Sequence, residues 1–398
     1  LLFLRAFPGS EALVDAADRL LQGFHRRPDL RRFRRELEDT GIGGTDLVFP
    51  FYWLTALWLV RRWPEALSIV WAEYAKKKTL KDVLHVLLPY SESTALDSAT
   101  LDSRRWLDAL RGPDETDATF LIRRFQELDV DTPMRESMYE QLDVPLRLTA
   151  GETTPARGRE RWSGAPLVLR DGPLPAVRRD LRGGLARIPF RVRDASPAEG
   201  RELIDLANTC MVTRLRDLYV FLNADPRDVR IVDFGEGLQF ACMGAVPDRR
   251  LVLEAVYGFL TLMNGVPIGY VLCSALGRSS EIAYNDFETY RGVGAAHGCE
   301  RILAMVARLF GSDTFAVDPY QLGHKNAEGQ RSGAWWFYYK LGFRPDDPKV
   351  RALVDEELAR IAADQPFVRA PSTRRLSRTH SATAASRSIS WVDWVCPG

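Results

Sequence analysis

A turn rich in small residues, spanning residues 291–296, has the clearest chemical potential in the sequence. A strand-like apolar run at residues 282–287 precedes it, and apolar residues at helical spacing follow it over residues 302–310. Gly292 and Gly294 would let the backbone approach a ligand, and the helix start would present unpaired N–H groups with partial positive charge. The order of strand, glycine turn and helix predicts a site for phosphate or pyrophosphate, unless the glycines make only a tight turn.

Two more elements are predicted after this helix. Residues 314–317 have the pattern of a strand, which ends at Asp318 and Pro319. Residues 326–341 have the pattern of a helix, and Gly342 suits the position just after a helix end. A strand, a glycine turn, a helix, a strand and a further helix therefore follow one another here.

This stretch resembles the GNAT superfamily of acyl-CoA N-acyltransferases through two half-motifs in the right order. The pyrophosphate loop of that family has the pattern Arg/Gln-x-x-Gly-x-Gly/Ala, which is matched by Arg291, Gly294 and Ala296. Its next helix usually ends in Ala-x-x-x-Tyr-x-x-x-Gly-Phe, which is matched at the same spacing by Ala334, Tyr338, Gly342 and Phe343. The likeness extends over about residues 188–345, with specific motifs only in the last third.

The resemblance implies acetyl-CoA or another acyl-CoA as co-substrate, and no metal. The implied pyrophosphate site consists of Arg291, Gly292, Val293, Gly294, Ala295 and Ala296. The family often has an asparagine seven residues before the tyrosine, where this chain has Arg331, and Asn326 lies five residues further upstream. Either the helix is extended at its start, so that Asn326 takes this place near the pantetheine arm, or the contact is missing.

The resemblance also implies a general base and a general acid. The base is often a glutamate on the strand before the loop, which makes Glu281, Asp286 and Glu288 the candidates. Alternation along a strand puts Glu281 on one face and the other two on the opposite face. Glu288, nearest the loop, is the first choice and Glu281 the second. Tyr338 matches the family tyrosine that protonates the leaving thiolate, although neighbouring aromatic residues also suit a purely structural role.

Other reactive side chains in this region have weaker claims. His297 and His324 lie in or near loops and could act as bases, but single histidines are more often structural. Cys299 falls inside the predicted helix, so a covalent acyl-enzyme is not expected.

Composition excludes several other classes of protein. The chain has 398 residues, of which 46% are hydrophobic and 27% charged, as in globular proteins. Its net charge of +1 gives no field that would attract nucleic acid or a membrane surface. The five cysteines have no metal-binding spacing, which predicts a reducing, cytoplasmic setting. The most apolar run, residues 47–60, is shorter than the roughly 20 residues that span a membrane.

We therefore predict an α+β protein with a mixed central sheet flanked by helices, preceded by a mainly helical region. The predicted parts are a helical region at residues 1–160, a linker at 161–187, a GNAT-like domain at 188–345, a helix at 346–366 and a disordered tail at 367–398. Within the domain, Asn264 and Gly265 between apolar runs predict a hairpin.

The expected function is acyl transfer from acyl-CoA to the amine of a small molecule or a peptide. Two alternatives stay open. One is a non-catalytic protein that keeps the fold for packing or partner binding, and the other is aminoacyl transfer from a charged tRNA, which would need a basic groove. The sequence does not define the acceptor, the acyl chain or the oligomeric state.

Overall fold

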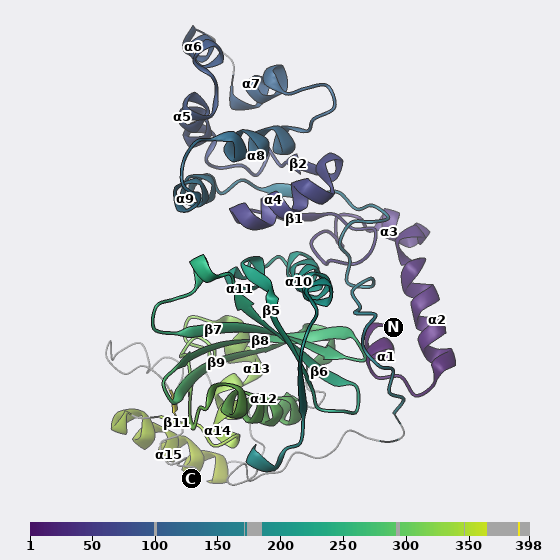
Figure 1. Cartoon of the computed structure of the whole chain (residues 1–398), viewed down its shortest axis with the longest axis vertical. Coiled ribbons are helices and arrows are strands. Elements are labelled where there is room, and N and C mark those ends of the chain that lie inside the picture. The colour runs from purple at the N-terminus through teal and green to yellow at the C-terminus, as the bar shows by residue number, and fades with distance from the viewer. Residues whose placement is uncertain are drawn as a thin grey trace. The chain divides into compact units, whose positions relative to one another are not determined.

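The structure is a computed structural model, which describes residues 1–98, 102–170, 172, 185–291, 295–345, 347–363 and 389–390 (Figure 1). It divides into two compact units. The first comprises residues 1–2, 12–162 and 202–222, and the second comprises residues 3–11, 163–201 and 223–398. This division differs from the predicted ranges, because residues 3–11 join the C-terminal unit and residues 202–222 join the N-terminal one.

The N-terminal part of the chain is mainly helical, as predicted. Up to residue 148 it forms α1 (Leu2–Ala6), α2 (Glu11–Gln22), η1 (Phe24–Arg26), α3 (Pro28–Arg32), β1 (Leu47–Phe49), α4 (Trp53–Arg62), η2 (Pro64–Ala66), β2 (Leu67–Ile69), α5 (Lys77–Leu87), α6 (Tyr90–Ser98), α7 (Ser103–Leu110), α8 (Asp117–Glu127), α9 (Thr132–Leu142) and β3 (Leu146–Leu148). The three short strands form an antiparallel sheet in the order β1-β3-β2, which the helical pattern did not reveal.

Aromatic side chains form the centre of the first unit. Trp53 on α4, Phe125 on α8 and Tyr139 on α9 are all buried, and Tyr139 meets both other rings edge-on at centroid distances of 5.4 Å. Side-chain caps fix the helix starts, since Thr116 accepts the Thr119 N–H at 3.1 Å before α8. Phe51, just before α4, is buried as well, so the apolar run at residues 47–60 contributes to this core.

The C-terminal part of the chain has a mixed sheet with helices packed against it, which confirms the predicted α+β class. Its elements are η3 (Leu185–Arg187), β4 (Arg191–Asp194), α10 (Pro197–Val212), α11 (Tyr219–Leu222), β5 (Ala224–Asp233), β6 (Leu238–Ala245), η4 (Pro247–Arg249), β7 (Ala255–Met263), β8 (Val266–Leu276), β9 (Ser279–Asp286), η5 (Glu288–Tyr290), α12 (Ala295–Phe310), β10 (Thr314–Val317), α13 (Ala327–Ser332), α14 (Ala334–Lys340), β11 (Arg344–Pro345), α15 (Pro348–Ala363) and β12 (Ile389–Ser390). The strand order is β11-β12-β10-β9-β8-β7-β6-β5-β4.

Neighbouring strands from β4 to β9 pair antiparallel, and in the described part of the chain β9 and β10 are the one parallel pair. The connection between this parallel pair passes through α12, beside the sheet in Figure 1. The hairpin predicted at Asn264 and Gly265 joins β7 to β8, and both residues have positive φ, 52° and 76°. The sequence therefore located both the hairpin and the strand–helix–strand crossover.

The structure changes several element boundaries. The helix predicted over residues 326–341 is divided into α13 and α14, and the helix predicted at residues 346–366 is α15, which extends from Pro348 to Ala363. Of the tail predicted to be disordered, residues 389–390 form β12, whereas residues 367–388 and 391–398 lie outside the described residues. Among the described residues, no helix combines the length and the apolar character needed to cross a membrane.

Candidate functional site

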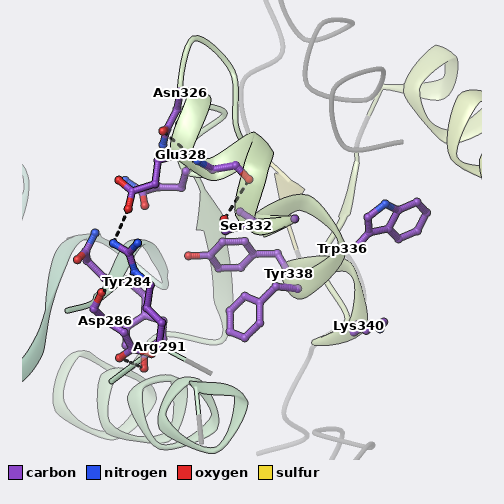
Figure 2. A pocket seen from close by; sticks show the side chains of 15 residues that line it. Tyr284, Asp286, Arg291, Asn326, Glu328, Ser332, Trp336, Tyr338 and Lys340 are labelled. Atoms are coloured by element: carbon purple, nitrogen blue, oxygen red, sulfur yellow. Dashed lines mark hydrogen bonds and ion pairs between the residues drawn. The ribbon is translucent and has the colours of Figure 1, made fainter. Parts of the chain in front are cut away.

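A pocket of about 400 Å³ lies where the parallel strand pair separates (Figure 2). The β9–β10 register includes only residues 279–281 of β9, opposite residues 314–316 of β10. On its other edge β9 stays paired with β8 as far as Asp286. Within the described residues, residues 282–286 therefore have no strand partner on the β10 side, and residues 284–286 form one wall of the pocket. Helices α13 and α14 supply the facing wall.

Asp286, the last residue of β9, is a carboxylate of the pocket wall whose pKa is raised. The Tyr284 hydroxyl donates a hydrogen bond to Asp286 Oδ1 at 2.5 Å. Burial raises the pKa of Asp286 from its ordinary 3.8 to about 6, against the Tyr284 hydrogen bond and the Arg291 charge, which both lower it. A carboxylate with a pKa near 6 is ionised at neutral pH and is a stronger base than an ordinary aspartate.

Tyr338 reaches the same pocket from the opposite side. It lies on α14 and is 3% exposed, and Figure 2 shows its ring extending from the helix towards the strand that carries Tyr284. The pKa of Tyr338 is raised, mainly by burial, while a hydrogen bond from the Tyr284 backbone acts in the opposite direction. Because burial outweighs this hydrogen bond, the Tyr338 hydroxyl keeps its proton at neutral pH and can donate it.

Arg291 is bonded to protein groups and is not free to bind phosphate. Its Nε donates to the Asp286 carbonyl oxygen at 3.2 Å, and its guanidinium forms an ion pair with Glu328 on α13. The ion pair joins the two sides of the pocket in Figure 2. Since Glu328 neutralises Arg291 in this arrangement, phosphate binding by the guanidinium would require the pair to separate.

The rest of the predicted phosphate loop is only partly visible. Gly292, Val293 and Gly294 lie outside the described residues. Ala295 and Ala296 form the first turn of α12, as the predicted helix start requires. The described structure thus shows both ends of this turn and leaves its interaction with phosphate as a prediction.

Asn326 lines the pocket, but both ends of its amide are already engaged. Its Oδ1 accepts the Gly329 N–H at 3.0 Å as the N-cap of α13, and its Nδ2 donates to the Tyr320 carbonyl at 3.1 Å. Gly333, with a φ of 71°, ends α13 and starts α14, so one predicted helix is a bent pair. Arg331, on the exposed side of α13, is not part of the pocket wall.

Glu288 and Glu281, the two carboxylates preferred from the sequence as the general base, lie outside the pocket wall. Glu288 is exposed in η5 and does not line the pocket. Glu281 is paired with Ser274 on β8 and Ala316 on β10, away from the pocket wall. Its pKa is raised, first by burial and then by repulsion from Asp318 and Glu254. Of the three carboxylates considered from the sequence, the structure brings only Asp286 together with Tyr338.

Two side chains of the pocket wall, Tyr284 and Asn285, had no separate signal in the sequence. Alternation along β9 would have placed Tyr284 on the same face as Asp286, which is the clue that was available. Asn285 gives no such clue, because a polar residue near a strand end is most simply explained by solvent contact.

The remaining reactive side chains do not form a second centre. Cys299 on α12 is buried, and burial, with Asp286 and Glu300 adding to it, raises the pKa of its thiol to about 12. A neutral, enclosed thiol is a poor nucleophile. His324 is partly buried and does not line the pocket, whereas the side chain of His297 lies outside the described residues. In the part of the chain that the structure describes, no cluster of three or more histidine, cysteine or acidic residues could hold a metal ion.

Comparison with known proteins identified no matching family model, curated protein or solved structure.

Proposed function

We propose that the C-terminal unit transfers an acyl group, with acetyl as the first choice, from acyl-CoA to an amine. One observation carries the proposal: Asp286, with its raised pKa, and the proton donor Tyr338 line one pocket at the open edge of β9. Acyl transfer to an amine needs both a base and an acid within reach of one carbonyl group.

The pocket dimensions suit the reactive end of an acyl-CoA. A volume of about 400 Å³ is within the roughly 300–1,000 Å³ of ligand sites and would hold the thioester and part of the pantetheine arm. Pantetheine contains two amide groups, and residues 282–286 have no strand partner on the β10 side. An amide that binds there must replace the bond of the Tyr284 N–H to Tyr338 or that of the Asp286 carbonyl to Arg291. The pyrophosphate would then lie at the start of α12, where backbone N–H groups favour an anion.

In the proposed reaction the acceptor amine loses two protons, one to Asp286 and one to Tyr338. Asp286 takes one proton from the ammonium group of the acceptor, and the neutral amine attacks the thioester carbonyl carbon. The resulting tetrahedral intermediate expels the thiolate as its C–S bond breaks, and the thiolate receives the Tyr338 hydroxyl proton. The second proton of the amine restores Tyr338, and Asp286 releases its proton to solvent, so the products are an amide, the free thiol and one proton.

Titration calorimetry with acetyl-CoA and a thiol-release assay with primary amines test this proposal. We expect binding in the micromolar to millimolar range and thiol release that depends on both substrates. A Gly294→Glu variant should lose binding through repulsion of the pyrophosphate. Ser279→Glu adds the same charge at an exposed position on β9 outside the pocket wall and is the matched control. Absence of binding at millimolar acetyl-CoA, or equal effects of the two variants, would overturn the proposal.

The Arg291–Glu328 ion pair favours a second candidate, a non-catalytic protein that binds a partner. An arginine already neutralised by a carboxylate is poorly prepared for pyrophosphate. This alternative predicts that acetyl-CoA does not bind and that neither the wild type nor variants at Asp286 or Tyr338 release thiol.

We also propose a reducing compartment, the cytoplasm, as the setting of the reaction. Cys210, Cys242, Cys273 and Cys299 are all free and buried. Unpaired cysteines in such numbers are usual where thiols are kept reduced.

A further inference from the structure

The side chain of Asn285 has an unmet hydrogen-bonding requirement. Its Oδ1 is buried and has no hydrogen-bond partner among the described residues, although Asn285 is one of the pocket-lining residues. Leaving a buried acceptor unsatisfied is unfavourable, and native proteins rarely tolerate it without a reason. The other asparagine of the pocket, Asn326, has both ends of its amide engaged. Asn285 is therefore available to accept a hydrogen bond from a ligand.

The neighbouring carboxylate also retains capacity for a ligand. Tyr284 donates to Oδ1 of Asp286, and an ionised carboxylate can accept several further hydrogen bonds at its other oxygen. Asp286 and Asn285 are consecutive on β9, so alternation directs their side chains to opposite faces of the strand. Both nevertheless line the same pocket, because the strand edge between these faces is open on the β10 side.

We propose that Asn285 positions the acceptor amine, which makes it a specificity-determining residue. The ammonium group donates one hydrogen bond to Asp286 and another to Asn285 Oδ1. After Asp286 has taken its proton, the amine keeps the bond to Asn285, which holds the nitrogen so that its lone pair can face the thioester carbonyl. This inference rests on the acyl transfer proposed above.

The arrangement defines a substrate class. A primary amine still has two N–H groups after losing a proton to Asp286, one for Asn285 and one for release during the reaction. A secondary amine has only one, so it must give up the bond to Asn285 to react. The acceptor should therefore be a primary alkylamine that enters the pocket as its ammonium ion.

Two substitutions at Asn285 separate hydrogen bonding from packing. Asn285→Leu keeps a similar volume but has no acceptor, whereas Asn285→Asp keeps the acceptor. We expect the leucine variant to raise KM for a series of primary amines from ethylamine to hexylamine by roughly 10-fold or more, the range for losing a hydrogen bond to a charged group. KM for acetyl-CoA should be unchanged, and the aspartate variant, which keeps the acceptor and adds a charge opposite to the ammonium, should have a KM for amines no higher than that of the wild type. Circular dichroism and thermal melting would verify that both variants fold.

Direct binding separates failure of this inference from failure of the proposed reaction. Saturation-transfer NMR with n-butylammonium chloride needs no acyl-CoA, and it should detect binding to the wild-type chain and to Asn285→Asp but not to Asn285→Leu. That pattern supports the amine site even if acetyl-CoA does not bind. Equal binding to all three proteins, or no binding to the wild type, would overturn it. A leucine variant with altered KM for acetyl-CoA alone would show that Asn285 bonds to the pantetheine arm, which also overturns the proposal.

Discussion

Replacing Asp286 with asparagine should make the protein more stable at neutral pH while removing its proposed base. Asparagine is nearly the same size, and its Oδ1 can still accept the Tyr284 hydroxyl at the position of the present 2.5 Å bond. It has no charge at any pH in the working range. The substitution therefore removes the cost of ionising a partly buried carboxyl and little else.

The magnitude follows from the pKa of Asp286. Burial raises it from 3.8 to about 6, so the folded state disfavours the ionised form. A pKa difference of this size corresponds to roughly 3 kcal/mol at pH values above both pKa values. Because the carboxyl faces an open pocket and is screened by solvent, we expect a gain of roughly 1–3 kcal/mol for Asp286→Asn at pH 7.5.

The pH dependence has a definite sign. Below pH 3.8 the carboxyl is protonated in both the folded and the unfolded chain, so wild type and variant should be equally stable. As pH rises through 4 to 6 the folded state retains a proton that the unfolded state has lost, and the wild type loses stability relative to the variant. Above pH 6 the difference should be constant. Urea unfolding of both proteins between pH 4 and pH 8 measures it.

The activity assay supplies the second half of the test. The variant should lose roughly 100-fold or more in kcat, and the wild-type rate should rise as pH passes about 6. Glu288→Gln, at the exposed carboxylate first preferred from the sequence, is the control and should change neither the rate nor the pH profile of stability. A stability difference that is independent of pH, or a wild type that is the more stable protein at pH 7.5, would refute the reasoning about Asp286. Loss of activity in the Glu288 variant would transfer the role of base to that residue.

Three further substitutions examine the walls of the pocket. Tyr338→Phe removes the proposed acid and should lower kcat by roughly 100-fold with little change in KM; unchanged thiol release would exclude this role. Gly298→Ala places a Cβ 2.9 Å from the Tyr284 hydroxyl oxygen, so we expect a loss of roughly 1–3 kcal/mol in urea unfolding, and a neutral result would mean that the ring shifts freely. Glu328→Gln releases Arg291 and should tighten acetyl-CoA binding several-fold in calorimetry, more strongly at low salt, whereas weaker binding would show that the ion pair supports the site.

Periodicity was sufficient for the large elements of the second unit. Strand β10 begins and ends where the sequence placed it, and the hairpin at Asn264 was correctly located, because turn chemistry and alternation agree there. The three-stranded sheet of the first unit was missed. Each of its strands has three residues, which is too short for alternation to be distinguished from part of a helical pattern.

The sequence predicted those residues of the candidate site that a pattern within one helix or strand can indicate, but not contacts between distant elements. Tyr338 was singled out because it lies at a fixed spacing from Gly342, which follows directly after the end of the same helix. The choice among three carboxylates depended on where β10 stops pairing with β9, which is a relation between strands distant in the sequence. The ion pair between Arg291 and Glu328 likewise joins a loop to a helix that follows much later, so no local pattern could reveal it.

Two polar side chains that are unfavourable to bury are neighbours on β9 of this unit. Asp286 pays a desolvation cost that an asparagine would avoid, and Asn285 leaves a buried acceptor without a partner among the described residues. Both lie on the part of β9 whose edge is left open because β10 ends early. A strand selected only for stability would extend its pairing and carry neutral side chains there. A desolvated carboxyl and an unsatisfied acceptor at an unpaired strand edge are expected of a site where a ligand supplies the missing interactions.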